Sequence, residues 1–314
     1  MGGYQLQRIY KTDPDTPEIR GPLLLTGVEL KEGDVITAID GVPTLSVSDA
    51  ASLLRAKVGR QVRITAYSGD RRTQTRDVIV VPISAAQESN LRYSDWEYSR
   101  RLSVEAGGKR DIGYVHLRAM GAGDYNQWAR DFYPVFNRQG LIIDVRHNNG
   151  GNIDSWILEK LLRKSWMYWN HHAGDADWNM QYAFRGHVVV LCDENTASDG
   201  EAFSEGFRRL GLGKVIGTRT WGGEVWLSSG NTLVDRGIAT AAESGVYGPE
   251  GKWLIEGHGV DPDIIIDNPP HATYQGQDAQ LEYAIKFLQE QIQKNPVTVP
   301  QHPPFPDKSL HGKS

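Results

Sequence analysis

Two short apolar segments, each followed by a loop and a helical pattern, place the strongest limit on how this chain can fold. Leu141–Val145 and Val188–Leu191 consist almost entirely of Val, Ile and Leu, as in strands that are buried on both faces. Helices are predicted to follow them, one from about Asn152 and one from Ser198 or Asp199. Because strands that alternate with helices usually pair in parallel, we predict an α/β domain with a parallel or mixed sheet and functional loops at the carboxyl ends of its strands.

The first 83 residues instead read as a β-rich block of short strands separated by turns. Val35–Ile39 is a strand that the hairpin signal Asp40-Gly41 follows, and one helix is predicted within Ser48–Lys57. Gly33–Ile36 followed by Ile39–Pro43 resembles the signature of PDZ domains, which bind a peptide as an extra strand at a sheet edge. The alternative is a plain accessory domain that binds no ligand.

The rest of the chain divides by composition. Residues 84–110 are polar and charged and are predicted to be a connector with some helix, and residues 111–295 form the α/β domain. Five of the 15 prolines fall between Pro296 and Pro306. We therefore expect the last part, 296–314, to be an extended or disordered tail.

Composition excludes several classes of protein. The 34 Lys and Arg residues against 39 Asp and Glu give a net charge of −5, which argues against a nucleic-acid-binding protein. The single cysteine, Cys192, excludes an internal disulfide framework and CxxC metal or redox motifs. No apolar run is long enough for a membrane span, and the first residues do not resemble a signal peptide, so we expect a cytoplasmic protein without membrane contact.

The loop after the first strand, Arg146–Asn152, contains the pair Gly150-Gly151. Adjacent glycines can adopt dihedrals in which successive backbone N–H groups converge on one anion. The loop is not a phosphate-binding P-loop, because no Gly-Lys-Ser/Thr follows it. An ordinary structural turn remains the alternative.

The loop after the second strand, Asp193–Glu201, places Ser198 where a helix is predicted to begin. Such a serine is either a helix N-cap or a nucleophile. As a nucleophile it would sit on an exposed turn, with the N–H of Asp199 facing an oxyanion formed on the substrate. The full Gly-x-Ser-x-Gly elbow is absent, because position 196 is Thr, although Gly200 is present.

Four motifs, taken together and in order, resemble the catalytic core of the tricorn protease family, in the clan of the C-terminal processing serine peptidases. They are Asp144–Gly151, Asp193–Glu201, Gly213–Gly223 and Glu256–Asp263. With the PDZ-like block, the resemblance extends over roughly residues 4–290.

This resemblance implies roles for particular residues. Ser198 matches the nucleophile, and the backbone N–H of Asp199 matches half of the oxyanion hole. Gly150-Gly151 matches the other half, without indicating which glycine donates, and Glu256 matches the acid that orients the catalytic histidine. The implied activity is acyl transfer by a serine endopeptidase on short peptides, without metal or cofactor, in a homo-oligomer.

The chain departs from the family at the general base. The family's base is the histidine of a Ser-His pair upstream of the PDZ-like domain, and none of the nine histidines here follows a serine. The lysine that serves C-terminal processing proteases is replaced by Gly223. We therefore expect this chain to be the carboxyl-terminal part of a tricorn-like peptidase whose base lies on a segment outside it.

Other candidate residues have simpler explanations. His258 is close to Glu256 and could replace the base, although a surface turn histidine is the plainer interpretation. The residue types of His171-His172 with Asp175 and Asp177 suggest a metal site, but adjacent histidines project poorly towards one ion. Cys192, at the end of an apolar strand, is expected to be a buried small hydrophobe.

Two other functions remain open at this point. A non-catalytic, peptide-binding pseudo-protease would have the same motifs without a base. A hydrolase of esters could use the same fold and nucleophile.

Overall fold

The computed structural model describes residues 2–69, 74–227, 230 and 232–306. It divides into two compact units, Met1–Leu102 and Ser103–Ser314, and each is described by itself. Within the described residues, no helix combines the length and the apolar character needed to cross a bilayer.

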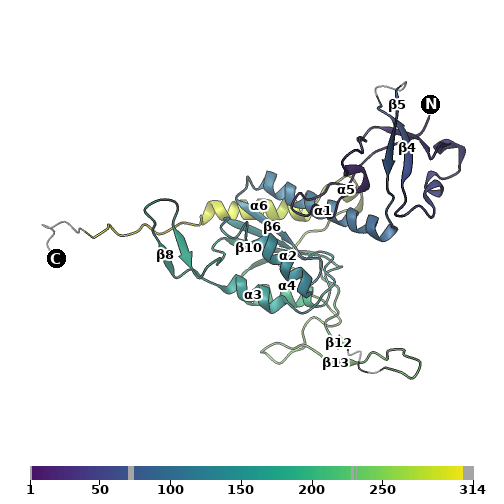
Figure 1. Ribbon diagram of the computed structural model, residues 1–314. Helices are drawn as coiled ribbons and strands as arrows, with labels where there is room; N and C mark the ends of the chain where they lie inside the picture. Colours follow the sequence, from purple (N-terminus) through teal and green to yellow (C-terminus); the bar gives the residue numbers. More distant parts are fainter. Residues whose placement is uncertain (1, 70–73, 228–229, 231, 307–314) are drawn as a thin grey trace. The chain divides into compact units, whose positions relative to one another are not determined.

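The first unit is built on a five-stranded antiparallel sheet (Figure 1). Its strand order is β1-β2-β4-β5, and β3 pairs with β2. One face carries a small core that includes Leu30, Ile39, Val62 and Val78. The strands are β1 (Tyr4–Gln5), β2 (Val35–Ile39), β3 (Val42–Pro43), β4 (Val62–Tyr67) and β5 (Thr75–Val80).

The helix predicted within Ser48–Lys57 is shorter and tighter than expected. It is a 3₁₀ helix, η3 (Ala50–Leu54), that starts at Asp49, whose Oδ1 accepts a hydrogen bond from the Ala51 N–H at 2.9 Å. Ala56 has a φ of 57°, in the left-handed region, and this turns the chain away from any longer helix. Two further 3₁₀ turns are η1 (Pro22–Leu24) and η2 (Thr44–Ser46).

The polar segment 84–110 is occupied mainly by one long helix, α1 (Ala85–Gly107). Ser84 and Gln87 begin it with a reciprocal capping pair: the Gln87 N–H donates to Ser84 Oγ at 3.2 Å, and the Ser84 N–H donates to Gln87 Oε1 at 2.9 Å. The division of the chain at 83, 110 and 295 stays a prediction.

The second unit contains the predicted α/β sheet, and every pair of its five strands is parallel (Figure 1). The strand order is β14-β11-β10-β7-β6. The strands are β6 (Ile112–His116), β7 (Gly140–Asp144), β10 (His187–Cys192), β11 (Gly213–Gly217) and β14 (Ile264–Ile265).

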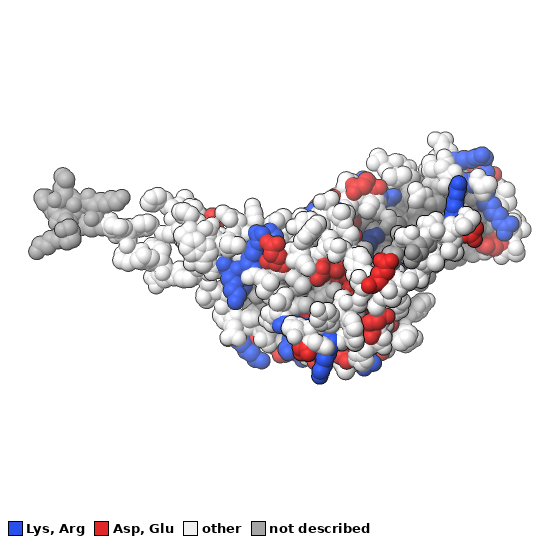
Figure 2. Space-filling view, turned by 90° about the horizontal axis from the view of Figure 1, so that it is seen from below, with Lys and Arg blue, Asp and Glu red and all other residues white. Residues whose placement is uncertain are grey.

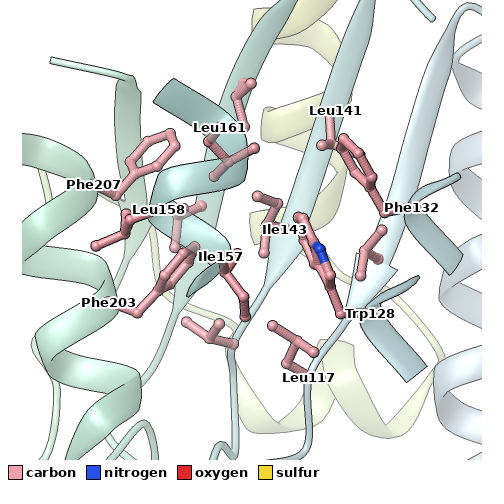
Figure 3. Packing of buried hydrophobic residues seen from close by; sticks show 14 of the residues in the cluster. Leu117, Trp128, Phe132, Leu141, Ile143, Ile157, Leu158, Leu161, Phe203 and Phe207 are labelled. Carbon is pink, nitrogen blue, oxygen red and sulfur yellow. The ribbon is translucent and has the colours of Figure 1, made fainter. Parts of the chain in front are cut away.

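Helices cover both faces of this sheet, which explains why its strands are apolar at nearly every position. Leu141 and Ile143 pack against α2 (Ala122–Phe132), α3 (Asp154–Leu162) and α4 (Asp199–Arg209) in the larger core, part of which Figure 3 shows. Ile142, between them, points to the opposite face and packs with residues of α6 (Ala279–Lys294). A short helix, α5 (Pro270–Tyr274), precedes α6.

Two small antiparallel pairs extend from this unit (Figure 1). They are β8 (Met167–Trp169) with β9 (Asp177–Asn179), and β12 (Trp226–Leu227) with β13 (Ala242–Ser244). On the face of this unit drawn in Figure 2, acidic and basic side chains are interspersed. Of the predicted tail, residues 296–306 contain no helix or strand, and residues 307–314 lie outside the described residues.

Candidate active site

Ser198 lies in a strained turn between β10 and α4. Its φ of 52° and ψ of −126° differ from the extended backbone of an ordinary N-cap residue. Gly200 completes the turn, because a Cβ at this position would lie 2.9 Å from Asn148 Oδ1. Strain of this kind at a half-buried serine is typical of a functional turn rather than of a simple helix start.

The two loops predicted at the carboxyl ends of β7 and β10 meet at Ser198. Gly150 has a φ of 79°, and a Cβ there would lie 2.5 Å from Ser198 Cβ. Gly151 faces the other way, because its Cβ would lie 2.1 Å from the Met120 carbonyl oxygen. Asn148 joins the loops: its carbonyl accepts from the Ala197 N–H at 2.9 Å. The close approach therefore requires glycine at both positions.

Some of the backbone N–H groups around Ser198 already donate a hydrogen bond within the protein, and others do not. The Gly150 N–H donates to Asn148 Oδ1 at 2.8 Å. The N–H groups of Gly151 and Asp199 have no hydrogen-bond acceptor among the described residues. Asp199 is the first residue of α4, where an N–H has no partner within the helix. Two donors near the serine are thus left for an anion.

Glu201, which the sequence interpretation gave no role, fixes this turn. Its carboxylate is fully buried. Oε1 accepts from the N–H groups of Ser198 at 3.1 Å and Gly223 at 2.9 Å, and Oε2 accepts from the Gly222 N–H at 2.7 Å and from the Thr220 hydroxyl. The Ser-x-x-Glu spacing of a capping box was the signal that could have identified it.

The side chain of Asp199 turns away from the Ser198 side of the loop and caps α3. Its Oδ2 accepts from the N–H groups of Ile153 at 2.7 Å and Asp154 at 3.1 Å. Burial and the neighbouring charge of Asp154 raise the pKa of Asp199 to about 6. The carboxylate thus has a positioning role, and the backbone N–H remains available.

Glu256 and Ser198 share one cleft of about 510 Å³, which Gly151 also lines. The Glu256 side chain is held by its Oε2, which accepts from the N–H groups of Glu224 and Val225, both at 2.8 Å. Trp221 and Gly223 line it too, so the cleft brings together residues from all four motifs. Among the described residues that line it there is no histidine.

Glu224 also lines this cleft, and no sequence signal pointed to it. Its side chain is only 6% exposed, and Oε2 is buried with no hydrogen-bond partner among the described residues. Burial, followed by the charges of Asp199 and Glu201, raises the pKa of Glu224 to about 8. The carboxyl of Glu224 is therefore mostly protonated at neutral pH.

A buried ion network stands behind the glycine loop. Arg146 Nη2 binds Asp144 Oδ2 at 2.6 Å, and its Nη1 binds Asp278 Oδ1 at 2.8 Å. Asp278 also caps α6 by accepting from the Leu281 N–H at 3.1 Å. A buried network in which every charge is paired holds its elements in one geometry, and here it joins the end of β7 to α6.

The remaining candidates lie away from the cleft or are occupied. His258 Nε2 contacts Asp261 Oδ2 at 2.7 Å on the surface. His171 Nε2 contacts Asp177 Oδ2 at 3.3 Å, and the described residues contain no group of three or more His, Cys, Asp or Glu suited to a metal ion. Cys192 is buried, as expected, and burial raises the pKa of its thiol far above the usual range, so it is inert as a nucleophile.

Comparison with known proteins supports the same interpretation. Residues 111–266 match the model of peptidase family S41, and residues 1–85 match that of the tricorn protease PDZ domain. The tricorn protease of Thermoplasma acidophilum is 33% identical over 302 residues, which are 96% of this chain and 28% of that protein. A putative tricorn-like protease C-terminal subunit of Sulfurisphaera tokodaii is 34% identical over 93% of this chain and 33% of its own length.

The fold agrees with these sequence matches. A crystal structure of the tricorn protease superposes with a TM-score of 0.82 at 32% identity, covering 93% of this chain and 28% of that chain. The chain thus spans about a third or less of the length of these relatives. With both family models and the structure in agreement, this chain belongs to the tricorn proteases, serine peptidases of family S41.

Proposed function

We propose that this chain supplies the nucleophile, the oxyanion hole and the orienting acid of a serine endopeptidase that cleaves short peptides by acyl transfer. The observation that carries the proposal is the cleft in which Ser198, Gly151 and Glu256 lie together, next to the unused N–H groups of Gly151 and Asp199. No step needs a metal or an organic cofactor.

The chemistry follows from these positions. The Ser198 Oγ attacks the peptide carbonyl carbon while a base removes its proton, and the C–N bond then breaks as that proton passes to the leaving amine. Water, deprotonated by the same base, releases the acyl group from Ser198. The two N–H donors stabilise the negative charge that forms on the carbonyl oxygen, both when Ser198 is acylated and when water releases the acyl group.

Of the two glycines, Gly151 is the one we assign as the oxyanion donor. The Gly150 N–H is already engaged by Asn148, and the role left for Gly150 is steric, since only a residue without Cβ fits against Ser198. Gly151 has both an unused N–H and a place in the cleft.

We further propose that the general base is a histidine from an upstream segment outside this chain. The absence of histidine among the described lining residues supports this. Glu256 is suited to hold that imidazole, because its Oε2 binds the backbone of Glu224 and Val225 while its Oε1 has no partner among the described residues. Action as a cytoplasmic homo-oligomer is also proposed, on the basis of the tricorn resemblance alone.

A fluorophosphonate probe tests whether Ser198 is a nucleophile. Mixed with the upstream segment of the natural protein, the chain is expected to be labelled on Ser198, as located by peptide mass spectrometry, and Ser198→Ala is expected to abolish labelling. Labelling elsewhere, or none while peptides still bind, would identify a peptide-binding module. Turnover of small esters without peptide cleavage would instead favour an esterase.

Replacing Glu256 by Gln in the complete enzyme tests its orienting role. A group that orients the base acts mainly in the transition state, so kcat is expected to fall strongly while KM changes little. Steady-state kinetics on a short peptide measure both. A large rise in KM with nearly normal kcat would place Glu256 in the substrate pocket.

A further inference from the structure

A second cavity, of about 440 Å³, lies near the amino end of β10, whereas Ser198 lies beyond the carboxyl end of the same strand. It is lined by Phe184, Arg185 and Val188 around the start of β10. The six residues of β10 extend about 20 Å at the usual rise of a strand. The cavity is therefore separate from the catalytic cleft.

The walls of this cavity combine an apolar floor with a cationic rim. Its apolar side chains include Leu161, Phe184, Val188 and Leu212, and its cationic side chains are Arg163, Lys164 and Arg185. Among the described lining residues there is no Asp or Glu. Glu159 pairs with Arg163 at 3.2 Å but is 70% exposed, where an ion pair contributes little.

Arg185 is fixed in place before any ligand arrives. Its guanidinium carbon lies 3.8 Å from the ring centroid of Trp178 and 5.7 Å from that of Tyr168, and Nη1 donates to the Thr298 carbonyl at 3.4 Å. Its Nε is buried without an acceptor among the described residues. A stacked guanidinium with unused donors is well suited to bind an anion.

The hydroxyl groups beside Arg185 add polar partners. Ser165 Oγ and Tyr168 Oη lie 3.0 Å apart, and both residues line the cavity. The hydrogen bond with Ser165, together with interactions with Arg185, lowers the pKa of Tyr168. The two hydroxyl groups therefore provide neutral hydrogen-bonding partners beside the Arg185 cation.

The end of a helix does not account for this arrangement. Arg163 and Lys164 follow the last residue of α3, where cations commonly offset the helix dipole. Arg185 is on a different segment, next to β10, and is stacked on the aromatic ring of Trp178 rather than placed at the helix end.

We propose that this cavity binds the carboxyl terminus of a peptide whose last side chain is apolar. A carboxylate can accept two hydrogen bonds from one guanidinium, and the Arg185 side chain with its two cationic neighbours would receive it. The apolar side chain would pack on Leu161, Phe184 and Leu212. A volume of about 440 Å³ suits one or two residues, and a free inorganic anion would leave the apolar floor uncovered.

The test uses the whole chain and a fluorescent pentapeptide ending in Ala-Leu with a free carboxylate. Binding measured by anisotropy at low salt is expected, with at least about 10-fold weaker affinity for the amidated peptide and for Arg185→Gln. Arg130→Gln, which removes an exposed arginine of α2, is the matched control and should bind as the wild type does. Equal affinity for carboxylate and amide overturns the proposal.

The PDZ-like domain and the catalytic cleft could also bind a peptide end, so the site must be located. A photo-crosslinking group on the last side chain is expected to label residues within 161–188, 211–212 or 297–298. It is not expected to label residues within 1–85, the catalytic-cleft residues Gly151 and Ser198, or residues within 221–256. Labelling only in the latter ranges overturns the proposal, as does full competition by inorganic phosphate at the affinity of the peptide. If Arg185→Gln fails to fold, Lys164→Gln with Arg163→Gln tests the same rim.

Discussion

Mixed with an upstream segment that carries a Ser-His pair, this chain is expected to hydrolyse short peptides at least about 10³-fold faster than it does alone. An unassisted serine hydroxyl is a weak nucleophile at neutral pH. The oxyanion donors and substrate binding can still leave roughly 10³–10⁴-fold catalysis over water, which is far below the rate of a working peptidase. The measurement is the rate of cleavage of a fluorogenic peptide with and without the segment.

Two controls test separately whether the gained activity needs Ser198 and whether it needs the histidine of the upstream segment. Ser198→Ala should abolish the gained activity, and a segment in which the histidine of the pair is replaced by alanine should not produce it. Strong peptidase activity of the isolated chain would contradict the prediction, because the base would then lie within these residues. Glu224 would be the first to replace in that event, since it lines the cleft whereas His258 is paired with Asp261 on the surface.

The parallel sheet was predictable from the sequence because burial on both faces leaves a direct mark on it. Leu141 and Ile143 contact one layer of helices and Ile142 the other, so the whole segment is apolar. The position of Ser198 at the start of α4 followed from the same pattern, since a helix had to begin after β10. The serine peptidase family followed from motifs and not from periodicity.

What the sequence did not reveal depends on contacts between distant segments. Glu201 binds four groups of which three belong to residues 220–223, and no local pattern predicts such pairings. The helix expected within Ser48–Lys57 has suitable apolar spacing, yet a left-handed residue at position 56 limits it to a short 3₁₀ turn. The burial of Glu224 likewise arises from loops that only the fold brings together.

Glu224→Gln is expected to stabilise the chain at alkaline pH by roughly 2–4 kcal/mol in the free energy of unfolding. The pKa of this carboxyl is about 8 in the folded protein and 4.5 for an ordinary glutamic acid. At a pH between 4.5 and 8, Glu224 keeps its proton in the folded chain but has released it in the unfolded chain. The contribution of Glu224 to stability is therefore fully present below pH 4.5 and is lost as the pH rises through 8.

Glutamine keeps the shape of the side chain but cannot ionise, so the variant avoids a buried negative charge beside Asp199, Glu201 and Glu256. Urea unfolding at pH 5 and pH 9 measures the difference, which should be small at pH 5 and large at pH 9. Glu290→Gln, at an exposed position of α6, is the matched control and should change stability by about 0.5 kcal/mol or less at both pH values. A Glu224→Gln variant that is equally or less stable than the wild type at pH 9 would show that the carboxyl ionises without cost, and the cleft would then contain a group that neutralises it.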